Sequence, residues 1–150
     1  MRVYTEFALV GVFLAAIQPM LWAQDHKAAQ ERAIAEIKKL GGKVDVDSKS
    51  PDMPVVGVDL KRTKVIDASL EHLKGLTKLE ILYLKDTGVT DDGMVYVEGL
   101  TNIEVLELGR TKVTDQGLGS LKGFTRLERL DLGGTEVTDT GLEHLKGLSQ

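Results

Sequence analysis

The chain has 150 residues, 42% of them hydrophobic and only 5% aromatic, which suits one domain with a core of Leu, Val and Ile. Its formal net charge of −4, without any basic stretch, argues against nucleic-acid binding, which needs a dense positive patch. The sequence has no cysteine, so disulfides, thiolate nucleophiles and cysteine-ligated zinc sites are excluded.

Residues 1–23 are predicted to be a secretory signal peptide. Arg2 is followed by an apolar run over residues 7–17, then by Pro19 and by the small residue Ala23. This order matches the positive end, the hydrophobic segment and the cleavage site of such signals. The run is shorter than the roughly 20 residues that cross a bilayer. Cleavage would release a secreted or periplasmic protein without a membrane span. The alternatives are an uncleaved segment that anchors the chain to the membrane, or a buried helix.

Residues 24–54 are predicted to form an N-terminal cap. The segment 25–40 carries apolar residues at helical spacing, and the glycine pair at 41–42 is expected to end the helix. Residues 43–47 alternate between apolar and polar, as in a strand. A polar turn with two prolines, 48–54, leads to the next strand.

From residue 55 the chain repeats with a period of 24 residues, as four copies and the stub of a fifth up to residue 150. Seven apolar columns recur in every copy, and one of them is Leu60, Leu84, Leu108 and Leu132. Each copy reads as a short strand, a turn and an outer segment with apolar residues at every third position. One such unit cannot bury its apolar edge alone, so the units are expected to stack into a solenoid with a parallel sheet on one side.

The pattern L-x-x-L-x-L-x-x-T-x-V-T-D-x-G-L, present in residues 79–94 (with Met94 last) and 127–142, resembles a leucine-rich repeat. The 24-residue unit and the VTDxGL motif are similar to the ribonuclease-inhibitor-like class found in many secreted bacterial proteins. The resemblance covers residues 55–148 and implies an α/β fold: a right-handed solenoid, with a short curved parallel sheet inside, short helices outside and an N-terminal helix-plus-strand cap.

One column of the repeat departs from that family. Most leucine-rich repeats have an Asn in the turn that bonds backbone between repeats, whereas this chain has threonine, at Thr63, Thr87, Thr111 and Thr135. A hydroxyl ladder is therefore expected in place of the Asn ladder. The first copy departs further, because Ile66 and Ser69 replace the threonine and the glycine of the VTDxGL motif.

Each copy also has an aspartate where its outer segment begins, namely Asp67, Asp91, Asp115 and Asp139. These residues are predicted to cap the outer helices by accepting hydrogen bonds from free backbone N–H groups. The alternative is a row of calcium sites, but calcium needs six to eight converging oxygens. One carboxylate per repeat does not supply them, so no metal site is predicted. The neighbouring small column of Ser69, Gly93, Gly117 and Gly141 is expected to let adjacent repeats approach closely.

No catalytic set can be assembled from the sequence. His72 and His144 occupy the same position three repeats apart, which separates them by at least about 14 Å at the usual strand spacing. Serine is scarce, and no histidine has a defined acidic partner. We therefore predict a protein that is not an enzyme and has no cofactor.

The residues that flank the core leucines of each strand are expected to lie on the concave face. The predicted binding residues are Asp59, Lys61, Ile81, Tyr83, Lys85, Val105, Glu107, Arg129 and Asp131. Parallel pairing would align four of them into an acidic stripe with Tyr83 as its aromatic member, beside an apolar patch. Tyrosine is a favoured interface anchor, and exposed apolar neighbours often mark a contact site. The predicted partner is an unidentified protein or peptide; the alternative is an ordinary solvated sheet surface.

The sequence stops where a fifth copy would begin, and solenoids normally need a polar terminal cap. An open edge is therefore expected, with unpaired strand backbone and the apolar residues Leu127, Leu130, Leu132, Val137 and Leu142. Such ends could pair as a homodimer, the chain could be a relic of a longer ancestor, or the natural protein could be longer. The leading hypothesis is protein or peptide binding at the concave face. The alternative is a structural protein that self-associates through this edge.

Overall fold

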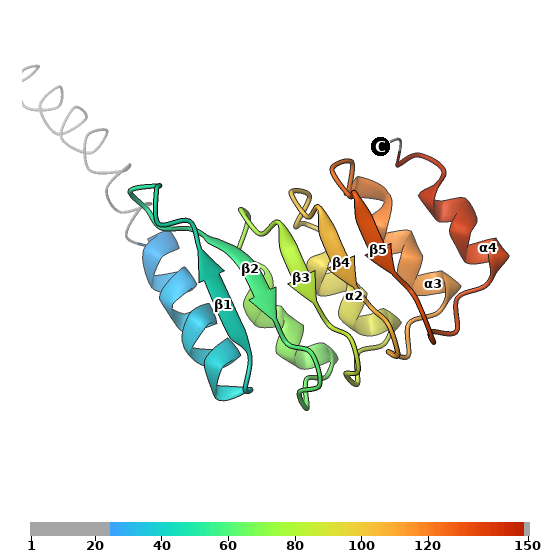
Figure 1. The fold of residues 1–150 in the computed structure, drawn as a ribbon, viewed down its shortest axis with the longest axis horizontal. Coiled ribbons are helices and arrows are strands. Elements are labelled where there is room, and N and C mark those ends of the chain that lie inside the picture. Colours follow the sequence, from blue (N-terminus) through green and yellow to red (C-terminus); the bar gives the residue numbers. More distant parts are fainter. Residues whose placement is uncertain (1–24, 149–150) are drawn as a thin grey trace, which may run out of the picture.

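The apolar columns of the repeat form the interior of a two-layer solenoid in the computed structural model, which describes residues 25–148 (Figure 1). One layer is a five-stranded sheet with the order β1-β2-β3-β4-β5, and short helices form the other layer. The predicted α/β solenoid is confirmed. The predicted signal peptide, residues 1–23, lies outside the described residues.

The N-terminal end of the solenoid is covered by a helix over residues 25–39 and by strand β1, Lys43–Val46. β1 pairs antiparallel with β2, Val55–Asp59. Gly41 ends the helix with a φ of 85°, a left-handed conformation that glycine adopts without steric cost. A Cβ at Gly42 would lie 2.6 Å from Leu60 Cδ2, so this glycine lets the helix end pack directly on the first repeat.

Three further strands follow, each parallel to the strand before it. The residues that pair across neighbouring parallel strands are 24 apart in the sequence, which is the period of the repeat. The three strands are β3 (Ile81–Tyr83), β4 (Val105–Glu107) and β5 (Arg129–Asp131). The outer layer comprises η1 (Asp67–Leu73), α2 (Asp91–Val97), α3 (Asp115–Leu118), η2 (Gly119–Gly123), α4 (Asp139–Leu142) and η3 (Glu143–Leu145). Leu82 of β3 pairs with Val58 of β2 and with Leu106 of β4, and all three side chains are buried.

The threonines of the turn column each donate a hydrogen bond within their own repeat, so the prediction of a hydroxyl ladder between repeats is wrong. The Oγ1 atoms of Thr63, Thr87, Thr111 and Thr135 donate to the carbonyl three residues earlier at 2.6–2.7 Å. A threonine hydroxyl is shorter than an asparagine amide and closes only the turn in which it lies. Backbone pairs join the repeats here instead, for example Asp86 N–H to the Gly109 carbonyl at 2.9 Å.

The outer α-helices begin at threonine, one residue before the predicted caps. Thr90, Thr114 and Thr138 are the N-caps of α2, α3 and α4, and each side chain accepts the N–H two residues on. The prediction that Asp91, Asp115 and Asp139 cap their own helices is therefore wrong, although each lies in the first turn, where the helix dipole favours negative charge. The prediction is also wrong for Asp67, which begins η1 after Ile66, a residue whose side chain makes no capping bond.

The aspartates instead bind the N-cap of the next repeat. Asp67 accepts the N–H of Thr90 at 2.7 Å and its hydroxyl at 2.8 Å, and Asp91 makes the same pair of bonds with Thr114. Asp115 does so with Thr138, and hydrogen bonds from Thr138 hold the pKa of Asp115 below its ordinary value. These carboxylates join consecutive repeats along the outer layer.

The glycine column makes room for these carboxylates. A Cβ at Gly93 would lie 2.5 Å from Asp67 Oδ1, and a Cβ at Gly117 or Gly141 would collide with the aspartate of the preceding repeat in the same way. Glycine therefore recurs at this position because the inter-repeat hydrogen bonds leave no space for a side chain.

Candidate functional site

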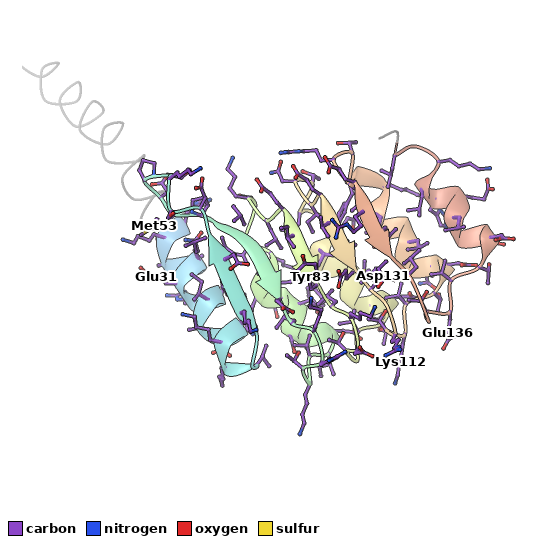
Figure 2. The ribbon with its side chains drawn as sticks, viewed as in Figure 1. Glu31, Met53, Tyr83, Lys112, Asp131 and Glu136 are labelled. Carbon is purple, nitrogen blue, oxygen red and sulfur yellow. The ribbon has the colours of Figure 1, made fainter. Side chains whose placement is uncertain are left out.

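The side chains that alternate with the buried leucines lie on the sheet face that the helices leave uncovered, where Figure 2 places Tyr83 and Asp131. Asp59 pairs with Tyr83, Tyr83 with Glu107, and Glu107 with Asp131. We call these four residues the central row. Neighbouring parallel strands lie about 4.8 Å apart, so the row forms one continuous band across four strands.

A second row runs alongside the central row and contains Gly57, Ile81, Val105 and Arg129. Ile81 and Val105 are half-buried, so their exposed parts form a small apolar patch next to Tyr83. Arg129 is exposed at the far end of this row. Asp45 of β1 covers Gly57, because a Cβ there would lie 3.1 Å from Asp45 Oδ2. The sequence alone did not point to Asp45, because its position depends on the antiparallel pairing of β1.

Lysines neutralise much of the predicted acidic stripe. Lys85 Nζ lies 3.0 Å from Asp131 Oδ2, two strands away. A Cβ at Gly109, in the same column as Lys85, would lie 2.8 Å from that oxygen, so glycine at this position leaves space for the ion pair. A hydrogen bond from Gly133 N–H and, after it, the Lys85 ammonium hold the pKa of Asp131 below its ordinary value.

Lys61 lies against three members of the central row at once. Its Nζ is 4.0 Å from the centroid of the Tyr83 ring, 4.0 Å from Asp59 Oδ2 and 3.9 Å from Glu107 Oε2. The backbone N–H of Lys61 also donates to Asp59 Oδ1 at 3.0 Å, which fixes the Asp59 carboxylate. We call Asp59, Lys61, Tyr83 and Glu107 the Lys61 cluster.

A charged rim follows the carboxyl ends of the strands. Arg62, Asp86 and Arg110 have φ values of 55–57°, and Gly134 completes this left-handed column. The Asp86 carboxylate lies 3.6 Å from Arg62 Nε and 3.3 Å from Arg110 Nη1. Between the rim and the Lys61 cluster is a hollow of about 350 Å³, lined by Lys61, Arg62, Lys85, Asp86 and Glu107. Sequence reasoning missed this rim, although the column of charged residues that ends in Gly134 was a usable signal.

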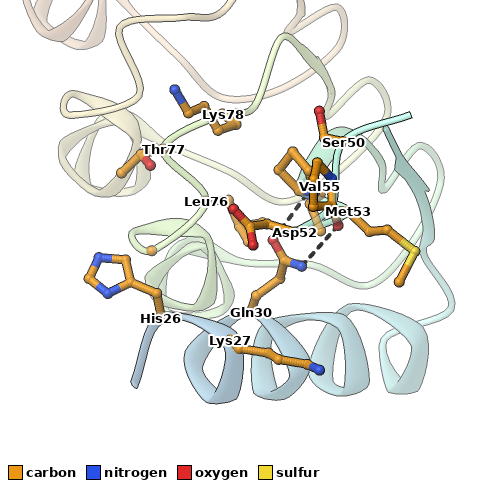
Figure 3. Close-up of a pocket in the computed structure, with 13 residues that line it drawn as sticks. His26, Lys27, Gln30, Ser50, Asp52, Met53, Val55, Leu76, Thr77 and Lys78 are labelled. Carbon is orange, nitrogen blue, oxygen red and sulfur yellow. Dashed lines mark hydrogen bonds between the residues drawn. The ribbon is translucent and has the colours of Figure 1, made fainter. Parts of the chain in front are cut away.

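A larger pocket, of about 580 Å³, lies where the N-terminal helix meets the proline turn and residues 75–78 (Figure 3). Gln30 fixes one wall, because its Nε2 donates to the Met53 carbonyl at 3.1 Å and its Oε1 accepts the Val55 N–H at 3.1 Å. The sequence predicted a turn here but did not indicate a pocket.

The last repeat is less buried than those before it. Leu130, Leu132 and Val137 are partly exposed, whereas their counterparts one repeat earlier, Leu106, Leu108 and Val113, are fully buried. Leu142 is 45% exposed. Within residues 25–148, β5 pairs only with β4.

The described residues offer no clustered metal ligands. Across residues 25–148, no three His, Asp or Glu side chains gather closely enough to hold a metal ion. His72 and His144 lie in η1 and η3, with α2 and α3 between them. In the same part of the chain, no helix has both the length and the apolar character needed to cross a bilayer.

The profile of the Leucine Rich repeat family matches residues 75–97, 99–122 and 125–146 in succession. The chain is a leucine-rich-repeat protein. The first matched stretch begins at residue 75, after Ile66 and Ser69, which depart from the repeat motif. The three matched leucine-rich repeats contain β3, β4 and β5.

Two solved structures from Listeria monocytogenes are similar to this leucine-rich-repeat chain. An internalin is 18% identical over 53% of the chain, with a TM-score of 0.40, and the match spans 29% of the internalin. Internalin C2 is 19% identical over 81% of the chain, with a TM-score of 0.39, and the match spans 70% of it. No match was found among curated proteins.

Proposed function

We propose that the chain is a non-enzymatic leucine-rich-repeat module that binds a protein or peptide through its concave face, outside the cytoplasm. Repeat proteins of this architecture use their extended concave surfaces for binding. The observation that carries the proposal is the central row, in which the strand register aligns Asp59, Tyr83, Glu107 and Asp131 on the uncovered face.

Tyr83 is the proposed anchor of this surface. Its side chain is half-buried between its strand neighbours and stands next to the apolar patch of Ile81 and Val105. A tyrosine already held in place loses little conformational entropy on binding and brings both apolar area and a hydroxyl. The ion pairs around it favour a partner that combines apolar and charged contacts over a purely charged one.

Affinity capture from the native cell envelope tests the proposal, with residues 24–150 as bait. Tyr83→Ala and Glu107→Lys are expected to lose the captured partner. The matched control is Tyr96→Ala, because Tyr96 is also half-buried and has a lysine, Lys74, 4.7 Å from its ring, but lies in α2 on the outer layer. Equal capture by the Tyr83 and Tyr96 variants would remove the basis for a concave binding site.

The proposed location rests on the N-terminal sequence, with its positive start, apolar run and small residue at position 23. Mass spectrometry of the protein from its native cells should give Gln24 as the N-terminal residue. A chain that begins at Met1 and sediments with membranes would instead support the anchored alternative.

A second candidate function is self-association through the last repeat. It is favoured by the partial exposure of Leu130, Leu132 and Val137, and by the exposed Leu142. Size-exclusion chromatography with light scattering of residues 24–150 at micromolar concentration is expected to give a dimer that Leu142→Lys dissociates. A monomer at that concentration would argue against this candidate.

A further inference from the structure

The ammonium of Lys61 is surrounded by an aromatic ring and two carboxylates but is hydrogen-bonded to neither carboxylate. Its distances to Asp59 Oδ2 and Glu107 Oε2, 4.0 and 3.9 Å, exceed the 2.7–3.2 Å of an N–H···O hydrogen bond. Lys85, in the same column one repeat later, lies 3.0 Å from Asp131 Oδ2 and is hydrogen-bonded to it. Lys61 is thus held loosely, whereas its counterpart is held tightly.

The groups around the ammonium are positioned without help from the Lys61 side chain. The backbone N–H of Lys61 fixes the Asp59 carboxylate, and the pairing of β2, β3 and β4 places Tyr83 and Glu107 beside it. The Lys61 side chain is 36% exposed and has a flexible four-carbon stem. It can therefore leave while the ring and the two carboxylates stay in place.

The chemistry of this site favours a cation. The face of a tyrosine ring attracts an ammonium or guanidinium group, and two carboxylates beside it add Coulomb attraction. The 350 Å³ hollow lined by Lys61 and Glu107 opens next to the site and gives space for a displaced lysine stem. The apolar patch of Ile81 and Val105 lies in the adjacent row and would contact the residues that flank an incoming basic residue.

We propose that Asp59, Tyr83 and Glu107 form a binding site for a lysine or arginine side chain of the partner, and that Lys61 occupies this site as an internal substitute. The partner's basic residue displaces Lys61 on binding. This inference rests on the proposed function of the concave face and names the chemical class that the face recognises. Lys61 accordingly limits affinity and selects for partners with a basic residue.

NMR titration of residues 24–150 tests the proposal with a capped Gly-Val-Lys-Val-Gly peptide as probe. The control peptide has norleucine in place of lysine, which removes the ammonium group and keeps an unbranched apolar side chain. An internal lysine that filled the site about nine tenths of the time would weaken binding about tenfold relative to an empty site. Lys61→Met is therefore expected to bind the lysine peptide about tenfold more tightly than the wild type, with the largest shifts at Tyr83 and Glu107.

Lys74→Met is the matched control, since it removes the same charge from beside a tyrosine ring, 4.7 Å from the centroid of Tyr96, but on the outer layer and away from the proposed site. It should leave the affinity unchanged. Adding Tyr83→Leu or Glu107→Gln to Lys61→Met should abolish the gain, with circular dichroism confirming that each variant is folded. An equal gain in Lys61→Met and Lys74→Met, or equal binding of the norleucine peptide, would overturn the proposal.

The cation site and the concave-face function can fail separately. If Tyr83→Ala loses the captured partner but Lys61→Met gains no affinity for the lysine peptide, the concave face binds its partner by other contacts. If Lys61→Met binds the peptide but Tyr83→Ala retains the captured partner, the cation site exists and the proposed function is wrong.

Discussion

Replacing Gly117 with alanine tests the contact that joins the second and third repeats. An added Cβ would collide with Asp91 Oδ1 and lie 2.9 Å from Val113 Cγ1. Overpacking of this kind costs about 1–3 kcal/mol. Asp91 accepts hydrogen bonds from Thr114 N–H at 2.8 Å and from its hydroxyl at 2.7 Å, and losing one bond to a charged acceptor costs about 1.5–3 kcal/mol.

Alanine offsets about 1 kcal/mol of this loss because it favours the helix more than glycine does. The net loss in free energy of unfolding is therefore about 1.5–5 kcal/mol. With a urea dependence of about 2 kcal/mol per molar, the midpoint should fall by about 0.8–2.5 M in urea unfolding followed by circular dichroism. In an Asp91→Ala background, the same change at Gly117 should cost much less because its collision partner is gone.

Gly119 provides the control for this experiment, two residues further along the same outer segment. Its φ and ψ of −57° and −30° are helical, and no atom lies within 4 Å of a Cβ built there. Gly119→Ala should therefore stabilise the protein by about 0.4–1 kcal/mol. If Gly117→Ala is as stable as Gly119→Ala, the explanation of the glycine column given above is refuted.

Three further outcomes are expected. Hydrogen bonds hold the pKa of Asp115 below 3.8, so the contribution of this carboxylate to stability is present above about pH 4 and is lost at lower pH. The urea midpoint of the wild type should therefore fall between about pH 5 and about pH 3, and Asp115→Asn should make this fall smaller. An unchanged fall would contradict the prediction. Leu106→Ala should cost about 2–5 kcal/mol and Leu130→Ala clearly less, because Leu106 is fully buried and Leu130 is partly exposed; equal losses in thermal melts would contradict the burial difference. Thr87→Val should cost about 1 kcal/mol in urea unfolding by removing the hydroxyl bond to Leu84, and no measurable loss would mean that this bond adds nothing.

The arrangement of the concave face followed from the sequence because the strand register equals the repeat period. Tyr83 and Glu107 are 24 residues apart and pair directly in the sheet. Once the period is recognised, every row of the face is fixed without any knowledge of side-chain geometry. The buried columns follow from the same periodicity.

Two kinds of contact could not be predicted from the sequence in this way. One depends on which residue of the repeat begins the helix, and the other depends on how far a side chain extends. Thr90 and Asp91 are adjacent and both are good capping residues, so spacing alone does not decide which one begins the helix. The ion pair between Lys85 and Asp131 spans 46 residues and two strands, and it depends on rotamers and on the space left by Gly109. The antiparallel direction of β1, which brings Asp45 over Gly57, likewise had no signal in the repeat.

The bonds from each aspartate to the next threonine run in one direction along the chain. Asp67, Asp91 and Asp115 each support the helix start of the repeat that follows, and within residues 25–148 no repeat supports the one before it through this contact. During synthesis, a new repeat would therefore meet a carboxylate that is already positioned by residues made earlier. The fold is suited to growth one unit at a time from its N-terminal end, in the order in which the ribosome delivers it.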